Sequence, residues 1–164
     1  MEKVLNRPKR VDPISLETKV KIMYKDVALQ PDKEYHFEMG RRLAERLGYD
    51  ADILNKIPAE AITSFSGVGY YFNLANIQEG EHVIDLGSGS GMDVFYAAQF
   101  VKNKGVVTGI DMTNEQLNKS NQLALKYLLN NVRFRKGYIE ELPLAAASAD
   151  VPLAAGEVAI TASM

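Results

Sequence analysis

The first 77 residues place apolar side chains at the three- and four-residue spacing that is typical of amphipathic helices. This spacing predicts one helix over 15–30 and a second over about 35–47. Asp50 can cap a short helix after these two, and Pro58 suits the first turn of another. The pattern therefore predicts a helical N-terminal part, and the apolar faces of these helices are expected to serve packing.

From residue 82 onward, short β-branched runs alternate with helical patterns. The predicted strands are 82–86, 106–110 and 132–135. A helix is expected after Gly91, and Thr113 with Gln116 predicts a capping box for a further helix that ends near Leu129. The order strand, helix, strand, helix, strand indicates a right-handed parallel α/β unit, in which a ligand binds at the carboxyl ends of the strands.

Composition narrows the classes of function. The 164 residues fit one domain, and a net charge of −2 disfavours nucleic acid as a partner. With no cysteine, the chain has neither disulfides nor thiolate metal ligands. No apolar run approaches the roughly 20 residues of a membrane span, and no apolar segment of a signal peptide follows the basic N-terminus. We therefore expect a cytoplasmic protein without a membrane partner.

A glycine-rich loop follows the first predicted strand. Gly87, Gly89 and Gly91 allow the backbone to turn tightly and to approach a ligand, and the next helix presents unpaired N–H groups to an anion. Asp111 closes the next predicted strand, where a carboxylate can accept hydrogen bonds from both ribose hydroxyls. The alternative is a tight strand-to-helix turn without a ligand. The glycine loop together with Asp111 favours a ligand that contains a nucleoside.

The spacing within this loop separates two cofactor classes. A dinucleotide fingerprint would have its third glycine at position 92, which is Met92, so an NAD-dependent oxidoreductase is disfavoured. The loop instead resembles the first motif of class I S-adenosylmethionine-dependent methyltransferases, in which an acid precedes alternating glycines. This resemblance implies a Rossmann-like α/β sheet, with Asp111 bound to the ribose and Met112 against the adenine. It also implies a loop along the methionine part of the cofactor, formed by Asp85, Gly87, Gly89 and Gly91.

The runs 109–113 and 131–143 resemble the arsenite methyltransferase branch of that family. The resemblance implies that Ile139 packs on the adenine and that Glu140 lies near its exocyclic amine. The alternative is an apolar loop residue beside a solvated charge. Members of this branch bind trivalent arsenic through cysteines, one of them within a Gly-Cys-Gly, because soft thiolates match a soft metalloid. Here that stretch is 67–69 with Val68 at its centre, so arsenic is disfavoured as the substrate.

The α/β part is short for a complete methyltransferase sheet. We expect an incomplete sheet of three to four parallel strands, because Pro152 interrupts a fourth strand and an alanine-rich sequence without the family pattern follows. The hypothesis is that the reading frame was cut or shifted near Val151. The predicted parts are a helical extension at 1–77, an S-adenosylmethionine-binding half at 78–151 and a divergent tail at 152–164.

An incomplete sheet would leave one edge of the first strand open. This predicts self-association through that edge, aggregation, or a cover supplied by the tail. The expected function is transfer of a methyl group from S-adenosylmethionine to a small-molecule acceptor, a reaction that needs no metal. The alternative is a cofactor-binding fragment without transfer activity. The pattern identifies no catalytic residue.

Overall fold

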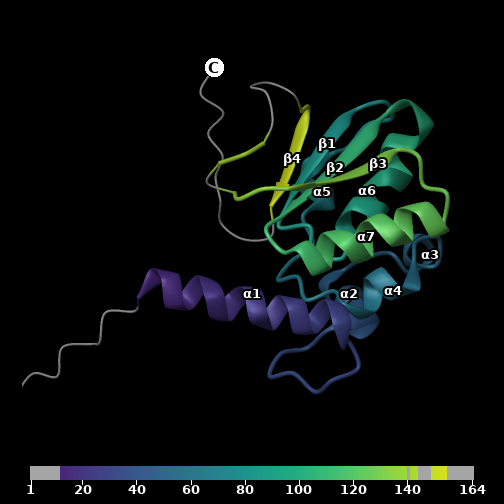
Figure 1. The fold of residues 1–164 in the computed structure, drawn as a ribbon. Coiled ribbons are helices and arrows are strands. Elements are labelled where there is room, and N and C mark those ends of the chain that lie inside the picture. Colours follow the sequence, from purple (N-terminus) through teal and green to yellow (C-terminus); the bar gives the residue numbers. More distant parts are fainter. Residues whose placement is uncertain (1–11, 140, 144–148, 155–164) are drawn as a thin grey trace, which may run out of the picture.

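The computed structural model describes residues 12–139, 141–143 and 149–154 of the chain (Figure 1). The N-terminal elements are α1 (Pro13–Leu29), α2 (Gly40–Leu47), α3 (Ala51–Leu54), α4 (Ala59–Thr63) and α5 (Phe72–Ala75). The remaining elements are β1 (His82–Leu86), α6 (Met92–Val101), the 3-10 helix η1 (Lys102–Lys104), β2 (Val106–Asp111), α7 (Asn114–Lys126), β3 (Val132–Lys136) and β4 (Val151–Ala154). Within these described ranges, no helix is both long and apolar enough to cross a membrane.

The four strands form one sheet in the order β3-β2-β1-β4, and every neighbouring pair is parallel. The helices α6 and α7 pack against β1, β2 and β3. Their side of the sheet belongs to the main hydrophobic core, which includes Val83 and Val107. On the opposite side, Ile84, Leu86 and Ile110 form a smaller buried cluster. The predicted α/β class with three to four parallel strands is confirmed.

The fourth strand corrects the expectation that Pro152 interrupts the sheet. β4 runs through Pro152, with Val151 opposite Val83 and Leu153 beside Asp85. Proline contributes no N–H to the ladder. The side chain of Leu153 is buried in the main core, however, and its burial stabilises the pairing.

The pairing with β4 also shows that the expected open edge of β1 is wrong. β1 is paired with β4 over residues 83–86 and with β2 on its other side. This cover removes the physical reason given for self-association through β1. Part of the cover, residues 152–154, comes from the segment predicted as a divergent tail.

The N-terminal helices follow the prediction with three differences. α1 begins at Pro13 instead of residue 15, and the Asp12 carboxylate accepts hydrogen bonds from its first turn. α3 begins directly after Asp50, whose side chain caps it as predicted. α2 begins at Gly40 instead of near residue 35, because the Gly40 N–H donates to the Phe65 carbonyl at 2.8 Å and holds the chain there. The short helix α5 was not predicted.

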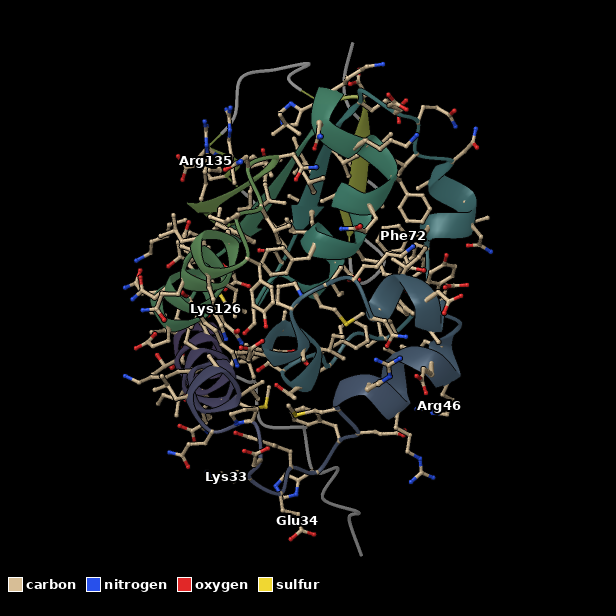
Figure 2. The ribbon with its side chains drawn as sticks, turned by 90° about the vertical axis from the view of Figure 1, so that its right-hand side faces the viewer. Lys33, Glu34, Arg46, Phe72, Lys126 and Arg135 are labelled. Carbon is tan, nitrogen blue, oxygen red and sulfur yellow. The ribbon has the colours of Figure 1, made fainter. Side chains whose placement is uncertain are left out.

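One hydrophobic core joins the N-terminal helices to the sheet. It includes an aromatic cluster in which Tyr49 and Phe72 pack edge-on against the buried Tyr96 of α6, and Phe65 packs edge-on against Tyr49. Figure 2 shows Phe72 beside α6. The predicted division at residue 77 remains a prediction, but the core continues across it. In Figure 1, α1 lies below the sheet and beside α7, and the two helices are in contact.

Candidate functional site

A cavity of about 680 Å³ lies where β1 and β2 end. This volume is within the range of small-molecule sites. Its walls come from α1, from the segment after α4, from the loop between β1 and α6, and from the segments that follow β2 and β3. The cavity therefore lies at the carboxyl ends of the parallel strands, where the sequence predicted a ligand.

The glycine loop forms one wall of this cavity through Gly87 and Gly89. Both glycines have positive φ, 77° and 53°. The N–H groups of Gly87 and Ser88 donate to the Ile110 carbonyl at 2.8 and 2.9 Å, so the loop is folded against the end of β2. A Cβ added at Gly87 would meet no atom within 4 Å, which means that this backbone faces open space.

Gly91 has a different role from the other two loop glycines. It does not line the cavity but precedes α6 with a φ of 91°, and a Cβ there would lie 2.8 Å from the Phe134 ring. Two constraints therefore act at Gly91, backbone conformation and the packing of the α6 start against β3. The resemblance placed Gly91 with the cofactor loop, and in the structure its contacts are with the core.

Replacing Gly91 with Ala is expected to lower the free energy of unfolding by about 2–3 kcal/mol. The cost of an alanine at positive φ and the cost of overpacking against the Phe134 ring add together. Gly87→Ala is the matched control, since its φ of 77° is similar and its surroundings are open. It should cost only about 1 kcal/mol. Urea unfolding of both variants measures the difference, and equal losses would contradict the packing role of Gly91.

Asp111 ends β2 and lies at the cavity. Its Oδ2 accepts from the Gly89 N–H at 2.9 Å, and its Oδ1 accepts from the Thr113 N–H at 2.8 Å. The carboxylate therefore joins the glycine loop to the start of α7. Each carboxylate oxygen can accept more than one hydrogen bond, so Asp111 retains the capacity to accept from ribose hydroxyls.

The predicted capping box is wrong, because Gln116 bonds elsewhere. The Thr113 side chain makes no capping hydrogen bond. Gln116 instead accepts from the Ser90 hydroxyl through Oε1 and donates from Nε2 to the Tyr24 carbonyl at 2.9 Å. The buried Gln116 amide thus connects α7 to the glycine loop and to α1.

Met112 and Ile139 line the same cavity as Asp111. The segment after β3 is held near β2 because the Gly137 N–H donates to the Asp111 carbonyl at 3.1 Å. The structure thus brings together both residues that the resemblance placed against an adenine, and their roles remain predictions. Glu140, which the resemblance placed near the exocyclic amine, lies outside the described residues.

Asp85 lies behind the cavity and does not line it. It is 3% exposed, and its Oδ2 has no hydrogen-bond partner among the residues that the structure describes. Burial raises the pKa of this carboxyl well above its usual value, and the negative charges of Asp93 and Asp111 raise it further. Ser88, which does line the cavity, also has a buried hydroxyl without a partner. Such unpartnered polar atoms are rare in folded proteins and mark this loop as a ligand-binding candidate.

Residues 77–162, about half of the chain, match the family model described as a methyltransferase domain. The chain belongs to the methyltransferase domain family. This confirms the predicted membership and the Rossmann-like class of the sheet.

Curated relatives of this methyltransferase domain include two arsenite methyltransferases. The protein of Halobacterium salinarum is 44% identical over 108 residues, which are 66% of this chain and 27% of the relative. The protein of Homo sapiens is 46% identical over 70 residues, which are 37% of this chain and 18% of the relative. The chain thus spans about a quarter or less of the length of these relatives.

Among solved structures, the domain is similar to CrArsM, an arsenic (III) S-adenosylmethionine methyltransferase from Chlamydomonas reinhardtii. The TM-score is 0.54 at 33% identity, over 63% of this chain and 37% of that one. This likeness supports both the fold and the predicted branch of the family.

The methyltransferase domain has a second acid at the cavity that sequence reasoning missed. Asp93 lies in the first turn of α6, and its Oδ1 accepts from the Tyr49 hydroxyl at 2.6 Å. Burial raises the pKa of the Asp93 carboxyl to about 6, although the hydrogen bond from Tyr49 acts in the opposite direction. Its position two residues after Gly91, at a helix start beside the loop, is the sequence signal that could have found it.

Sequence reasoning also missed the contribution of α1. The face that it assigned to packing supplies Leu16, Glu17, Val20 and Tyr24 to the cavity wall. The helix is tied to the opposite side by the Lys21 ammonium, which donates to the Tyr138 hydroxyl at 2.7 Å. Conversely, Val68 is 69% exposed and lies outside the cavity lining.

Proposed function

We propose that this methyltransferase domain binds S-adenosylmethionine in the cavity at the carboxyl ends of β1 and β2, and that it transfers the methyl group to a small-molecule acceptor. The observation that carries the proposal is the joint position of the glycine loop and Asp111 at one cavity. Family membership supports this assignment. The chain covers only part of its relatives, and the activity is therefore inferred from this site.

The residues of the cavity fit a cationic cofactor. Its acidic lining residues are Glu17, Asp93 and Asp111, and none of the described lining residues is Lys, Arg or His. The Glu17 carboxylate is paired with Lys21 at 2.6 Å, which leaves Asp93 and Asp111 as the uncompensated acids. Such a wall favours a sulfonium cation over an anionic ligand. The unpartnered Ser88 hydroxyl supplies a further polar contact.

When bound, S-adenosylmethionine supplies an electrophilic methyl group on a positively charged sulfur. The residues of the chain bind the cofactor, orient it toward the acceptor and exclude water. Asp111 holds the ribose, Met112 and Ile139 flank the adenine, and the apolar side chains of Leu16 and Phe65 keep water from the reacting groups.

The acceptor that we propose is not arsenic bound by thiolates, although the named relatives are arsenite methyltransferases. The chain contains no cysteine, and oxygen and nitrogen ligands are poor partners for a soft metalloid. Val68, at the centre of the Gly-x-Gly stretch, is exposed and does not line the cavity. We therefore propose a small molecule that needs no thiolate ligand.

Isothermal titration calorimetry with S-adenosylmethionine, S-adenosylhomocysteine and NAD tests the cofactor. We expect binding of the first two and none of NAD, because Met92 occupies the position of the third dinucleotide glycine. Absence of binding by both adenosyl ligands would overturn the proposed function. Binding without methyl transfer to any acceptor would favour the second candidate, a cofactor-binding module without transfer activity.

A further inference from the structure

The face of α1 that meets the cavity is apolar and only partly covered. Leu16, Val20 and Tyr24 follow each other at steps of four residues, so they lie on one side of the helix, and all three line the cavity. Leu16 is nevertheless 51% exposed. An apolar side chain that lines a cavity and still meets water is stabilised when a ligand covers it. This face is therefore suited to contact with a ligand.

The chain from α4 onward extends the same surface with Ala61 and Phe65. The Phe65 ring is held in place, because it packs edge-on against the Tyr49 ring with 5.3 Å between the ring centroids. Together these residues form the apolar wall, which consists of Leu16, Val20, Tyr24, Ala61 and Phe65. Two of its five members are aromatic. Because aromatic rings pack favourably on one another, the wall favours a ligand that contains an aromatic ring.

The apolar wall comes from different elements than the groups proposed for the cofactor. The glycine loop and Asp111 lie at the carboxyl ends of β1 and β2, whereas the wall belongs to α1 and to the chain from α4 onward. Figure 1 shows α1 below the sheet. Because both sets of residues line one cavity, a cofactor held at the strand ends leaves the apolar wall for a second molecule.

The cavity offers no free cation to a second molecule. None of the described lining residues is Lys, Arg or His. Two lysines bond to lining residues from outside, and both ammonium groups are engaged. Lys21 donates to the Glu17 carboxylate at 2.6 Å and to the Tyr138 hydroxyl at 2.7 Å. Lys119 donates to the Ser64 hydroxyl and to a carbonyl of α1 at 3.1 Å.

The negative charges of the cavity disfavour an anion as the second molecule. Asp93 and Asp111 line the same cavity, and at pH 7.5 the pH lies above the pKa of about 6 to which burial raises the Asp93 carboxyl. The single positive charge of a sulfonium offsets one of these two carboxylates. The occupied cavity therefore repels a carboxylate or phosphate and accepts an uncharged compound.

We propose that the apolar wall binds the methyl acceptor, and that this acceptor is an uncharged small molecule with an aromatic ring. The inference rests on the proposed function, which supplies the cofactor in the same cavity. It assigns a binding role to the cavity face of α1 and names the chemical class of the acceptor. Leu16 is the wall residue that the acceptor covers with the largest change in exposure to water.

Two fluorescent probes with the same ring skeleton test the class of the acceptor. N-phenyl-1-naphthylamine is uncharged, and 8-anilino-1-naphthalenesulfonate adds one negative charge. The chain is first saturated with S-adenosylhomocysteine at pH 7.5, so that the probe reports only the remaining space. Fluorescence titration should show the uncharged probe binding at least tenfold more tightly than the anionic one.

Leu16→Arg should reverse this preference, because it replaces apolar surface of the wall with a cation. We expect at least fivefold weaker binding of the uncharged probe and at least fivefold tighter binding of the anionic one. Ile14→Arg is the matched control. Ile14 lies on the same helix, is 75% exposed and does not line the cavity, so both affinities should stay within twofold of the unaltered chain. Thermal unfolding checks that both variants are folded.

The outcomes separate the two proposals. If calorimetry shows that the unaltered chain does not bind S-adenosylhomocysteine, the proposed function and this inference both fail. If it binds but displaces the uncharged probe, the apolar wall belongs to the cofactor site and only this inference fails. Equal affinity for the two probes also overturns only the inference. Equal changes in Leu16→Arg and Ile14→Arg would place the probes on the outer surface of α1, with the same consequence.

Discussion

Replacing Asp111 with Ala is expected to weaken binding of S-adenosylhomocysteine by about 100-fold and to lower the free energy of unfolding by about 1–3 kcal/mol. The binding loss would follow from the two hydrogen bonds that we propose between the carboxylate and the ribose. The stability loss follows because the N–H groups of Gly89 and Thr113 lose their charged acceptor. Calorimetry and urea unfolding measure the two effects on the same preparation.

Asp150→Ala is the control for the effect on stability alone. The Asp150 Oδ2 accepts from the His82 N–H at 2.8 Å at the amino end of β1, away from the cavity. This variant should lose a similar part of the folding free energy and retain full affinity for S-adenosylhomocysteine. If Asp111→Ala binds the ligand as well as Asp150→Ala does, Asp111 is not the ribose ligand.

The protein without ligand is expected to lose at least about 1 kcal/mol of stability as the pH rises from 5 to 7.5, from Asp93 alone. The folded state raises the pKa of Asp93 to about 6 and that of Asp85 well above its usual value, mainly through burial. In this range the unfolded chain has already released protons that the folded chain still binds. Stability therefore falls with rising pH. Urea unfolding at intervals of half a pH unit measures the slope.

Asp85→Asn isolates the larger share of this effect. The amide removes the charge that burial disfavours, so the variant should be more stable than the unaltered chain at pH 7.5 and should show a shallower slope. Asp150→Asn, which changes an exposed aspartate, should leave the slope unchanged. A stability that is constant or rises between pH 5 and 7.5 would show that these two carboxyls ionise as easily in the folded state as in the unfolded one.

The sheet could be predicted from the sequence because the first three strands carry short β-branched or alternating apolar runs. β1 was predicted at its observed bounds, and β2 and β3 each extend only one residue further. The sequence pattern gave a wrong prediction where a contact between residues far apart in the chain decides the structure. Pro152 predicted an interruption of the fourth strand, because proline is unfavourable within a sheet. The strand forms nevertheless, because Leu153 is buried and the segment pairs with β1.

The candidate site was predicted in part, for a related reason. The glycine loop and Asp111 could be found because their spacing along the chain carries the motif. The α1 wall could not be found in this way, since spacing does not tell which face of a helix meets a cavity formed by other segments. Gln116 shows the same limit, because its partners Ser90 and Tyr24 lie far away along the chain.

The position of α1 has a consequence for how fast a ligand enters and leaves. This helix closes one side of the cavity, yet the Lys21 contact to Tyr138 and the ion pair of Lys25 with Glu115 join side chains that are partly or largely exposed to solvent. Each such contact is worth about 0–1 kcal/mol and weakens in salt. We expect release of a ligand bound in this cavity to require movement of α1 and to become faster as ionic strength rises.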